Sequence, residues 1–238
     1  MKRILKYTII ILAIIVIALG LYIKLNTYTP ESQALEAMKE ANVSEHKNYY
    51  VIEGEKVEGN LIFYPGGFVE AESYGVLAQL LSKANIRTFI IKSPLNLAIL
   101  NSNAYKDVME AFPSDEPWFL GGHSLGGSSA IIGYDKNRGD VEGLILLASY
   151  GTEAIDLSNS DLKVLSIRAS NDLVLDLETY ELRKEQLPKA TFYELIEGGN
   201  HCGFGFYGDQ KKDGSATLSN EDQHDQTSQL IIDFMIKE

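Results

Sequence analysis

The sequence contains little cysteine and little proline, and its positive charge is scarce. A single cysteine, Cys202, cannot close an internal disulfide, and six prolines exclude a collagen-like chain. Apolar residues make up 45% of the chain and charged residues 23%, which is typical of a globular protein rather than a disordered one. The length of 238 residues is enough for one sizeable α/β domain and a short additional segment.

The scarcity of positive charge argues against a nucleic-acid partner. The chain has 21 Lys and Arg residues against 33 Asp and Glu residues. Four of the basic residues lie within residues 1–24, where there is no acidic residue, so the rest of the chain has 17 basic residues against 33 acidic ones. Phosphate contacts require a basic patch, and a body this acidic should also be repelled by anionic lipid.

Only the N-terminus carries a long apolar run. Residues 7–23 read YTIIILAIIVIALGLYI, and as a helix this run is about 25 Å long, near the lower limit for crossing a bilayer. Lys2, Arg3 and Lys6 precede it, so the positive-inside rule keeps the N-terminus cytoplasmic. Residues 1–25 are therefore predicted to form a single-pass membrane anchor, with the rest of the chain on the extracytoplasmic side.

A cleaved signal peptide is the alternative for this segment. Ala18, Leu19 and Gly20 fit a small-x-small cleavage site, which would give a secreted protein. The residues that follow are again apolar, whereas a cleavage region normally becomes polar, and this favours the uncleaved anchor. Residues 26–48 are expected to form a polar connector with one or two helical turns at 34–41, and His46 within it to be solvated.

Residues 49–238 are predicted to form the catalytic domain, because apolar runs alternate with helical spacing throughout. Strands are predicted at 49–53, 60–64, 87–91, 118–120, 144–148, 164–167 and 191–196. Helices are predicted at 71–84, 104–112, 125–134, 175–187 and 227–236. This alternation indicates a doubly wound, mostly parallel sheet, in which functional residues gather at the carboxyl ends of the strands. Residues 149–161 are too few to build a large cap domain over such a site.

A nucleophile elbow is predicted at GHSLG, residues 122–126. The motif follows the strand PWFLG and opens the small-residue helix GGSSAIIGY, which is the strand–turn–helix setting that such an elbow requires. The tight turn lifts the hydroxyl of Ser124 above the sheet, and flanking glycines are needed because a Cβ would collide with neighbouring backbone. Ser124 is therefore the candidate nucleophile.

The base that activates this serine is expected to be His201. It lies in GGNHCGFG, between the last predicted strand and the final helix, where the order Ser…Asp…His places it. Of the other histidines, His46 lies in the connector and His224 in a polar stretch before the last helix. His123 adjoins Ser124 on the elbow, and we interpret it as a packing residue or a support for the oxyanion loop.

The acid is expected to be Asp172. It leads off the carboxyl end of the strand at 164–167, between the nucleophile and the base in chain order. Asp176 is the alternative, although its position suggests the first turn of the following helix. Cys202, beside the base, is interpreted as a small packed side chain rather than a second nucleophile.

The oxyanion donors are expected to be two backbone amides. One belongs to Leu125, at the N-terminus of the helix that follows the serine, and the other to Gly67 in the loop YPGGF, with Phe68 as its alternative. Substrate contacts are predicted for residues near these loops, although they fit plain packing equally well: Phe68, Asn96, Leu97, Tyr150 and Phe204.

Several motifs together resemble the α/β-hydrolase superfamily across residues 49–238. FYPGGFVEAESY, SPLNLAILNSNAY, GGHSLGG, ASYGT and GGNHCGFGFYG are similar to membrane-anchored bacterial hydrolases of the dienelactone-hydrolase-like, or carboxymethylenebutenolidase-like, group. Two residues depart from that group: Ser124 stands where dienelactone hydrolases proper have cysteine, and Ala169 where many relatives have glycine. The serine argues against dienelactone as substrate.

The resemblance implies hydrolysis of small or medium acyl esters through an acyl-enzyme, without a cofactor, and we predict no metal site. Two other functions fit the same residues. An acyltransferase would use the same triad with an alcohol or amine acceptor, and a binding protein would keep the fold without turnover.

Overall fold

Eight strands form a single sheet in a computed structural model that describes residues 2–136 and 138–237. Their order across the sheet is β1-β2-β4-β3-β5-β6-β7-β8. From β4 to β8 all neighbours are parallel, whereas β1 and β2 are antiparallel at one edge. The strands are β1 (Val43–Glu45), β2 (Tyr49–Ile52), β3 (Gly59–Tyr64), β4 (Ile86–Ile91), β5 (Trp118–His123), β6 (Gly143–Leu147), β7 (Lys163–Ala169) and β8 (Phe192–Ile196).

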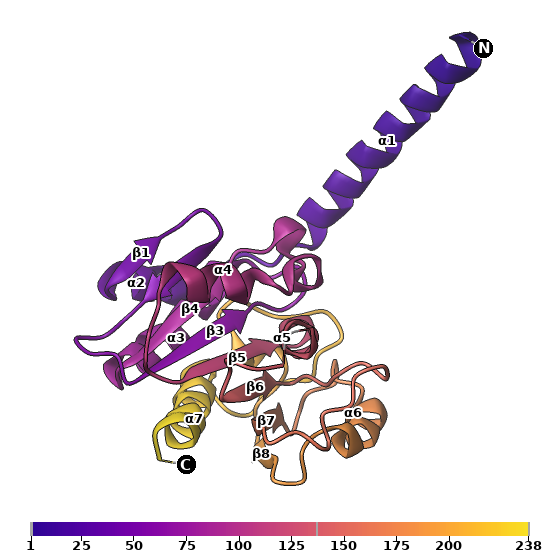
Figure 1. Ribbon diagram of the computed structural model, residues 1–238. Helices are drawn as coiled ribbons and strands as arrows, with labels where there is room; N and C mark the ends of the chain where they lie inside the picture. The colour runs from indigo at the N-terminus through magenta and orange to yellow at the C-terminus, as the bar shows by residue number, and fades with distance from the viewer. Residues whose placement is uncertain (1, 137, 238) are drawn as a thin grey trace.

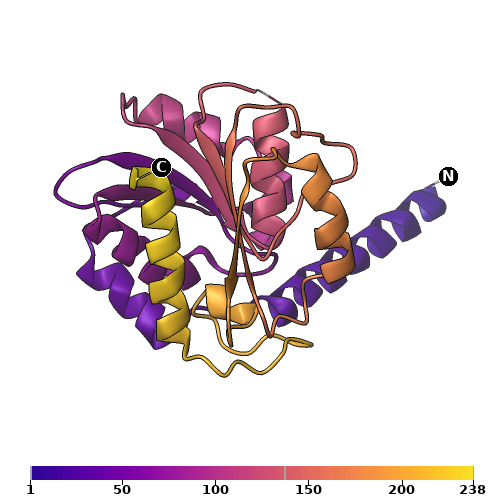
Figure 2. The same cartoon turned by 90° about the horizontal axis from the view of Figure 1, so that it is seen from below.

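Helices cover both faces of this sheet (Figures 1 and 2). The helices of the domain are α2 (Ser32–Glu40), α3 (Gly75–Lys83), α4 (Ala104–Ala111), α5 (Leu125–Asp135), α6 (Leu177–Arg183) and α7 (Asn220–Ile232), and α1 (Lys2–Asn26) projects from it. Apolar side chains of α3 and α7 form a buried cluster with one face of the strands, and those of α4 and α5 form a second cluster with the other. Strands buried on both faces explain the uninterrupted apolar runs of the sequence, such as LILL in β6.

Short helical turns join several of these elements. They are η1 (Ala71–Tyr74), η2 (Pro94–Asn96), η3 (Ala98–Asn101), η4 (Lys184–Gln186), η5 (Cys202–Phe204) and a closing π-helical turn at Asp233–Lys237. The helices predicted at 71–84 and 175–187 are each divided, into η1 with α3 and α6 with η4. Residues 148–162, between β6 and β7, contain no helix or strand, so no cap domain is built there.

The final helix begins earlier than its apolar pattern predicts. Helix α7 starts at Asn220, not at residue 227, because the hydroxyl of Ser219 accepts a hydrogen bond from the amide of Asp222 and caps the helix. His224 therefore lies inside the helix and not before it. Its ring is buried, packs on Phe206 at 4.4 Å between ring centroids, and its Nδ1 donates to the carbonyl of Asn220.

Residues 26–48, expected to be a connector, are folded onto the domain. They contain α2, whose contacts with α3 bury Ala34 and Ala37, and β1, which pairs with β2. His46 packs on Tyr49 and Phe112, with ring centroids at 4.7 Å and 5.6 Å, and is only half-exposed rather than solvated.

Helix α1 is long and projects from the domain (Figure 1). Its stretch Leu5–Asn26, 22 residues, is long and apolar enough to cross a membrane, and none of it is buried against the domain. A signal sequence near an N-terminus has the same features. The chain after the helix is held to the domain, because the amide of Tyr28 donates to the carbonyl of Phe68 at 2.8 Å and the amide of Glu31 to that of Phe206 at 2.8 Å.

Candidate active site

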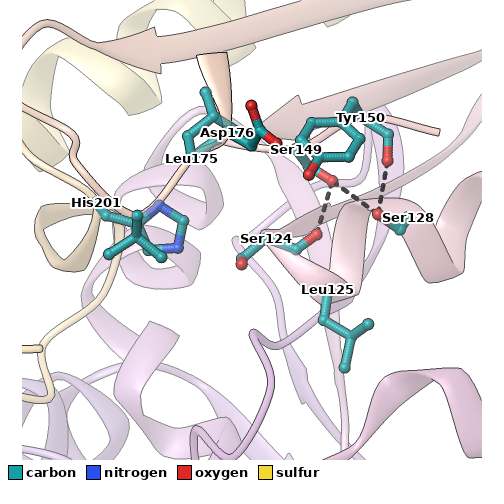
Figure 3. Close-up of a pocket in the computed structure, with 10 residues that line it drawn as sticks. Ser124, Leu125, Ser128, Ser149, Tyr150, Leu175, Asp176 and His201 are labelled. Atoms are coloured by element: carbon teal, nitrogen blue, oxygen red, sulfur yellow. Dashed lines mark hydrogen bonds between the residues drawn. The ribbon is translucent and has the colours of Figure 1, made fainter. Parts of the chain in front are cut away.

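Ser124 lies on a tight turn between β5 and α5. Its backbone angles, φ 53° and ψ −121°, are strained for a residue with a side chain, and such strain costs about 1–3 kcal/mol. Two hydrogen bonds hold the turn: the amide of Ser124 donates to the carbonyl of Leu147 at 2.9 Å, and the hydroxyl of Ser149 donates to the carbonyl of Ser124 at 2.6 Å. The turn leaves the Ser124 hydroxyl on the side of the pocket that faces His201 (Figure 3).

Glycines on either side of the serine permit this turn. A Cβ on Gly126 would overlap the carbonyl oxygens of Tyr64 and Pro65, and a Cβ on Gly122 would lie 2.6 Å from the Tyr64 oxygen. Neither backbone can move without displacing β3, so only glycine fits at the two positions. The crowding brings the end of β3 and its following loop directly against the start of α5.

Asp172 and His201 meet at the carboxyl edge of the sheet. Asp172 follows β7 and His201 follows β8, and Asp172 Oδ2 lies 2.8 Å from His201 Nδ1. Both side chains are almost completely buried, at 1% and 2% exposure. The carboxylate accepts from Nδ1–H, which leaves Nε2 of the neutral ring without a proton. Among the described residues, His201 Nε2 has no hydrogen-bond partner, so it is available to take a proton from a neighbouring hydroxyl.

The second oxygen of Asp172 holds the loop that follows it. Oδ1 accepts hydrogen bonds from the amides of Val174 and Leu175, each at 2.8 Å. The carboxylate is thus fixed by three hydrogen bonds, two from backbone and one from the imidazole, and cannot rotate away from His201 without breaking all of them.

Three successive amides after β3 differ in what they bind. The amide of Gly66 donates to the hydroxyl of Tyr74 at 2.9 Å, and that of Phe68 donates to the carbonyl of Asn96 at 2.7 Å. The amide between them, that of Gly67, has no acceptor within the described part of the chain. Leu125, the first residue of α5, likewise has no intrahelical acceptor for its amide.

The two free amides belong to residues in contact. A Cβ on Gly67 would lie 3.2 Å from Leu125 Cδ2, so the residues are close neighbours. Two unpaired N–H groups on neighbouring residues, one of them directly after Ser124 at a helix N-terminus, have the chemistry to stabilise an oxyanion. The amide of the alternative donor, Phe68, is already bonded to the carbonyl of Asn96, which favours Gly67.

His123 supports the loop that carries Gly67. The hydroxyl of Tyr74 accepts from the amide of Gly66 and lies 2.9 Å from His123 Nδ1, to which it donates. All three groups are buried. Burial and the nearby His201, whose ring centroid is 4.5 Å away, hold the pKa of His123 well below its ordinary value, so the ring stays neutral and can accept this bond.

The pocket above Ser124 has a volume of about 240 Å³. It is lined by Ser124, Leu125, Ser128, Ala148, Ser149, Tyr150, Val174, Leu175, Asp176 and His201 (Figure 3). Of the five predicted substrate contacts, only Tyr150 is among them. Phe204 is buried in the core at 1% exposure, and Phe68, Asn96 and Leu97 lie outside the pocket on the loops after β3 and β4.

Several pocket residues were not predicted, among them Val174, Leu175 and Ser128. A usable signal existed for the first two, because they follow Asp172 directly at the carboxyl end of β7. Ser128 is one turn into α5, and its hydroxyl donates to the carbonyl of Tyr150 at 2.6 Å, thereby fixing that residue at the rim.

Asp176 and Cys202 have structural surroundings. Asp176 is the N-cap of α6, where it accepts from the amide of Thr179 at 3.1 Å, and this hydrogen bond lowers the pKa of its carboxyl. Burial raises the pKa of the Cys202 thiol to about 11, which leaves it protonated and a poor nucleophile at neutral pH.

Solved structures of three hydrolases resemble this chain at low sequence identity. An esterase from Thermogutta terrifontis has a TM-score of 0.60 at 13% identity and covers 84% of this chain and 93% of its own. A monoacylglycerol lipase from Paleococcus ferrophilus has a TM-score of 0.59 at 15% identity, with 78% and 99% covered. A dienelactone hydrolase from Anabaena variabilis has a TM-score of 0.54 at 14% identity, with 82% and 97% covered. These likenesses show the fold.

No curated protein matches the sequence. The model of the Alpha/beta hydrolase family does match, over residues 60–225, a range that contains β3 through the start of α7 and the serine, acid and histidine described above. The fold predicted from alternating strands and helices is therefore confirmed, and the chain belongs to the Alpha/beta hydrolase family.

Proposed function

We propose that this protein is a serine carboxylesterase that cleaves small or medium acyl esters through a covalent acyl-enzyme. The observation that carries the proposal is the state of His201. One ring nitrogen is bonded to a buried carboxylate, the other is unpaired, and the ring lines the same pocket as Ser124. A general base needs this combination of an orienting acid and a free nitrogen beside the nucleophile.

The proposed mechanism uses only groups of this chain. Ser124 Oγ attacks the ester carbonyl carbon while its proton passes to His201 Nε2, and Asp172 stabilises the imidazolium. The amides of Gly67 and Leu125 bind the oxyanion of the tetrahedral intermediate. As the intermediate collapses, His201 returns the proton to the leaving alcohol. Water, deprotonated by the same nitrogen, then releases the acid from Ser124.

The pocket supports a modest acyl group. A volume of about 240 Å³ is below the usual range for drug-sized ligands, and its apolar wall is formed by Leu125, Val174 and Leu175. The fold likeness to an esterase and a monoacylglycerol lipase is consistent with ester substrates.

We further propose that α1 anchors the protein in a membrane. The basic residues before the apolar stretch leave the N-terminus cytoplasmic, so the catalytic domain is extracytoplasmic. Fractionation of cells that express the full chain should recover it with membranes after a carbonate wash, whereas a cleaved signal peptide would leave it soluble.

Labelling with a fluorophosphonate tests the proposed chemistry. The wild-type chain should label covalently at Ser124 and hydrolyse p-nitrophenyl esters, and Ser124→Ala should lose labelling and about 10⁶-fold in kcat. Ser128→Ala is the matched control, since Ser128 lines the pocket but its hydroxyl is bonded to the Tyr150 carbonyl. A folded wild-type chain that does not label would instead indicate a binding protein. Acyl transfer to an added alcohol in preference to water would indicate a transferase.

A further inference from the structure

The end of α1 contacts the loop that carries the oxyanion amide. The ring of Tyr22, in the last turns of the helix, meets the ring of Phe68 edge-on at 6.3 Å between centroids. Phe68 is the neighbour of Gly67. The last turns of α1 thus contact the residue next to Gly67, the candidate oxyanion donor.

The segment after the helix is held to the domain by backbone hydrogen bonds and by ring packing. Tyr28 forms a parallel bridge with Val69, donating to the carbonyl of Phe68 at 2.8 Å and accepting from the amide of Glu70 at 3.1 Å. Its ring packs on Tyr207 at 5.4 Å between centroids. If residues 5–26 lie in a membrane, these contacts at residue 28 keep the edge that carries Gly67 close to the lipid.

An uncharged apolar segment lies on the same edge. Residues 93–105 read SPLNLAILNSNAY and contain no charged residue, although the chain as a whole carries 33 acidic side chains. The segment is joined to the oxyanion loop by the hydrogen bond from Phe68 to Asn96, and in Figure 1 the turns η2 and η3 lie beside the domain end of α1. Within it Leu95, Ile99 and Leu100 are exposed, at 51%, 42% and 56%.

These observations combine into one arrangement. Exposed leucine and isoleucine on an uncharged turn beside a membrane helix have the chemistry of an interfacial anchor, whose apolar side chains enter the boundary between headgroups and acyl chains. We propose that the catalytic edge faces the bilayer through residues 95–100, and that the substrate is a single-chain amphiphilic ester that enters the pocket from the same leaflet. The substrate part of this inference rests on the proposed esterase function, and the placement rests on the proposed membrane anchor.

The pocket and the charge of the chain narrow the substrate class. A volume of about 240 Å³ accommodates part of one acyl chain and not two. The net charge of −12 disfavours anionic headgroups, so an uncharged or zwitterionic ester is expected.

Fluorescence quenching tests the placement without using activity. The full chain is inserted into phosphatidylcholine vesicles that contain brominated phosphatidylcholine, with tryptophan introduced as Leu100→Trp or, as control, Leu182→Trp. Leu182 lies at the end of α6 and is exposed to a similar extent, 63% against 56%, and the single native tryptophan, Trp118, is buried in both variants. The bromines should remove about half of the added emission at position 100 and leave position 182 unquenched. Equal quenching at both positions, or none at either, overturns the placement.

Hydrolysis in the same vesicles tests the substrate class. The substrates are monooleoylglycerol within the bilayer and p-nitrophenyl acetate dissolved in water. Ile99→Glu combined with Leu100→Glu should lower the rate on the vesicle ester by about tenfold, because charge at the interface opposes insertion, and leave the rate on the acetate unchanged. Leu182→Glu should alter neither rate.

Three outcomes overturn the substrate class. One is an equal loss on both esters, and another is no loss on the vesicle ester. The third is a wild-type chain that hydrolyses the acetate but not monooleoylglycerol. A chain that hydrolyses neither ester and does not label at Ser124 disproves the esterase proposal, and with it the substrate class, while the quenching result still decides the placement.

Discussion

His123 and His201 are neighbours with rings 4.5 Å apart, yet their surroundings differ. Both are buried, and within the described part of the chain each has one nitrogen with a hydrogen-bond partner and one without. The partner of His201 is a carboxylate, Asp172, whereas the partner of His123 is the neutral hydroxyl of Tyr74. A carboxylate stabilises an imidazolium and a phenol does not, so only His201 is equipped to take up a proton.

The difference shows that burial and proximity to the serine do not identify a base. His123 is adjacent to Ser124 in sequence, but the turn directs it into the core, where burial keeps it neutral. His201 is 77 residues away in sequence and lines the serine's pocket. The hydrogen-bond partner, a carboxylate for His201 and a phenol for His123, is what distinguishes the proposed base from its neighbour.

The largest difference in activity is expected when each of the two histidines is replaced by glutamine. His201→Gln should lower kcat on p-nitrophenyl acetate by about 10⁶-fold, because glutamine cannot accept the serine proton. His123→Gln should lower kcat by only about tenfold, since an amide oxygen can still accept from Tyr74. Similar losses in two folded variants would contradict the assignment of the base.

Tyr74→Phe tests the support of the loop that carries Gly67 without altering the proposed base. Removing the hydroxyl leaves the buried amide of Gly66 and His123 Nδ1 unpaired, which should cost about 1–3 kcal/mol of stability. The Gly67 amide then loses its fixed position, so kcat should fall by about tenfold while KM stays nearly constant. Thermal unfolding and full kinetics measure the two effects, and a rise in KM without a fall in kcat would exclude a role in the oxyanion loop.

The smallest effect on activity is expected at a third buried histidine, His224. Burial lowers its pKa from the ordinary 6.5 to about 4. Between about pH 4 and pH 6.5, His224 is protonated in the unfolded chain and neutral in the folded chain. Its contribution to the free energy of unfolding is therefore complete above about pH 6.5 and is lost as the pH falls towards 4. The loss amounts to about 3 kcal/mol from this group.

Unfolding midpoints of the detergent-solubilised chain between pH 7 and pH 4.5 measure this loss. His224→Gln should show a shallower fall than the wild type, and esterase activity at pH 7 should be unchanged. The matched control is His46→Gln, because this histidine is half-exposed. A fall as steep in His224→Gln as in the wild type would contradict the assigned cause.

Much of the sheet could be predicted from the sequence, because parallel strands buried on both faces produce uninterrupted apolar runs. Residues 60–64 and 144–148 are of this kind, and they match β3 and β6 closely. The elbow could be located for a similar reason, since its glycines are required by backbone crowding that any such turn creates. The chain order of serine, acid and histidine led to Asp172 and His201, which the fold brings to 2.8 Å.

Elements stabilised by polar contacts were missed. The first turns of α7 read NEDQH, without an apolar stripe, yet Gln223 and His224 are buried there because their side chains are bonded to the loop around Asn200 and to the helix itself. Strand β1 has only three residues and depends on its pairing with β2, which residue pattern alone does not reveal.

The walls of the pocket could not be assigned from residue type. Aromatic side chains near the site fit the core and the pocket equally well, and Phe204 belongs to the core. Two residues that do line the pocket, Val174 and Leu175, are held there by hydrogen bonds from their backbone amides to Asp172. Such contacts depend on the folded loop and have no signature in composition.

These same hydrogen bonds limit how the protein can evolve. Because one carboxylate both orients the imidazole and holds the amides of residues 174 and 175, the proposed base and one wall of the pocket share a single support. A substitution at 174 or 175 can leave these backbone hydrogen bonds in place, whereas a proline there removes an amide and would disturb the acid as well. Substrate range is therefore expected to diverge among descendants by substitution within a loop of fixed length.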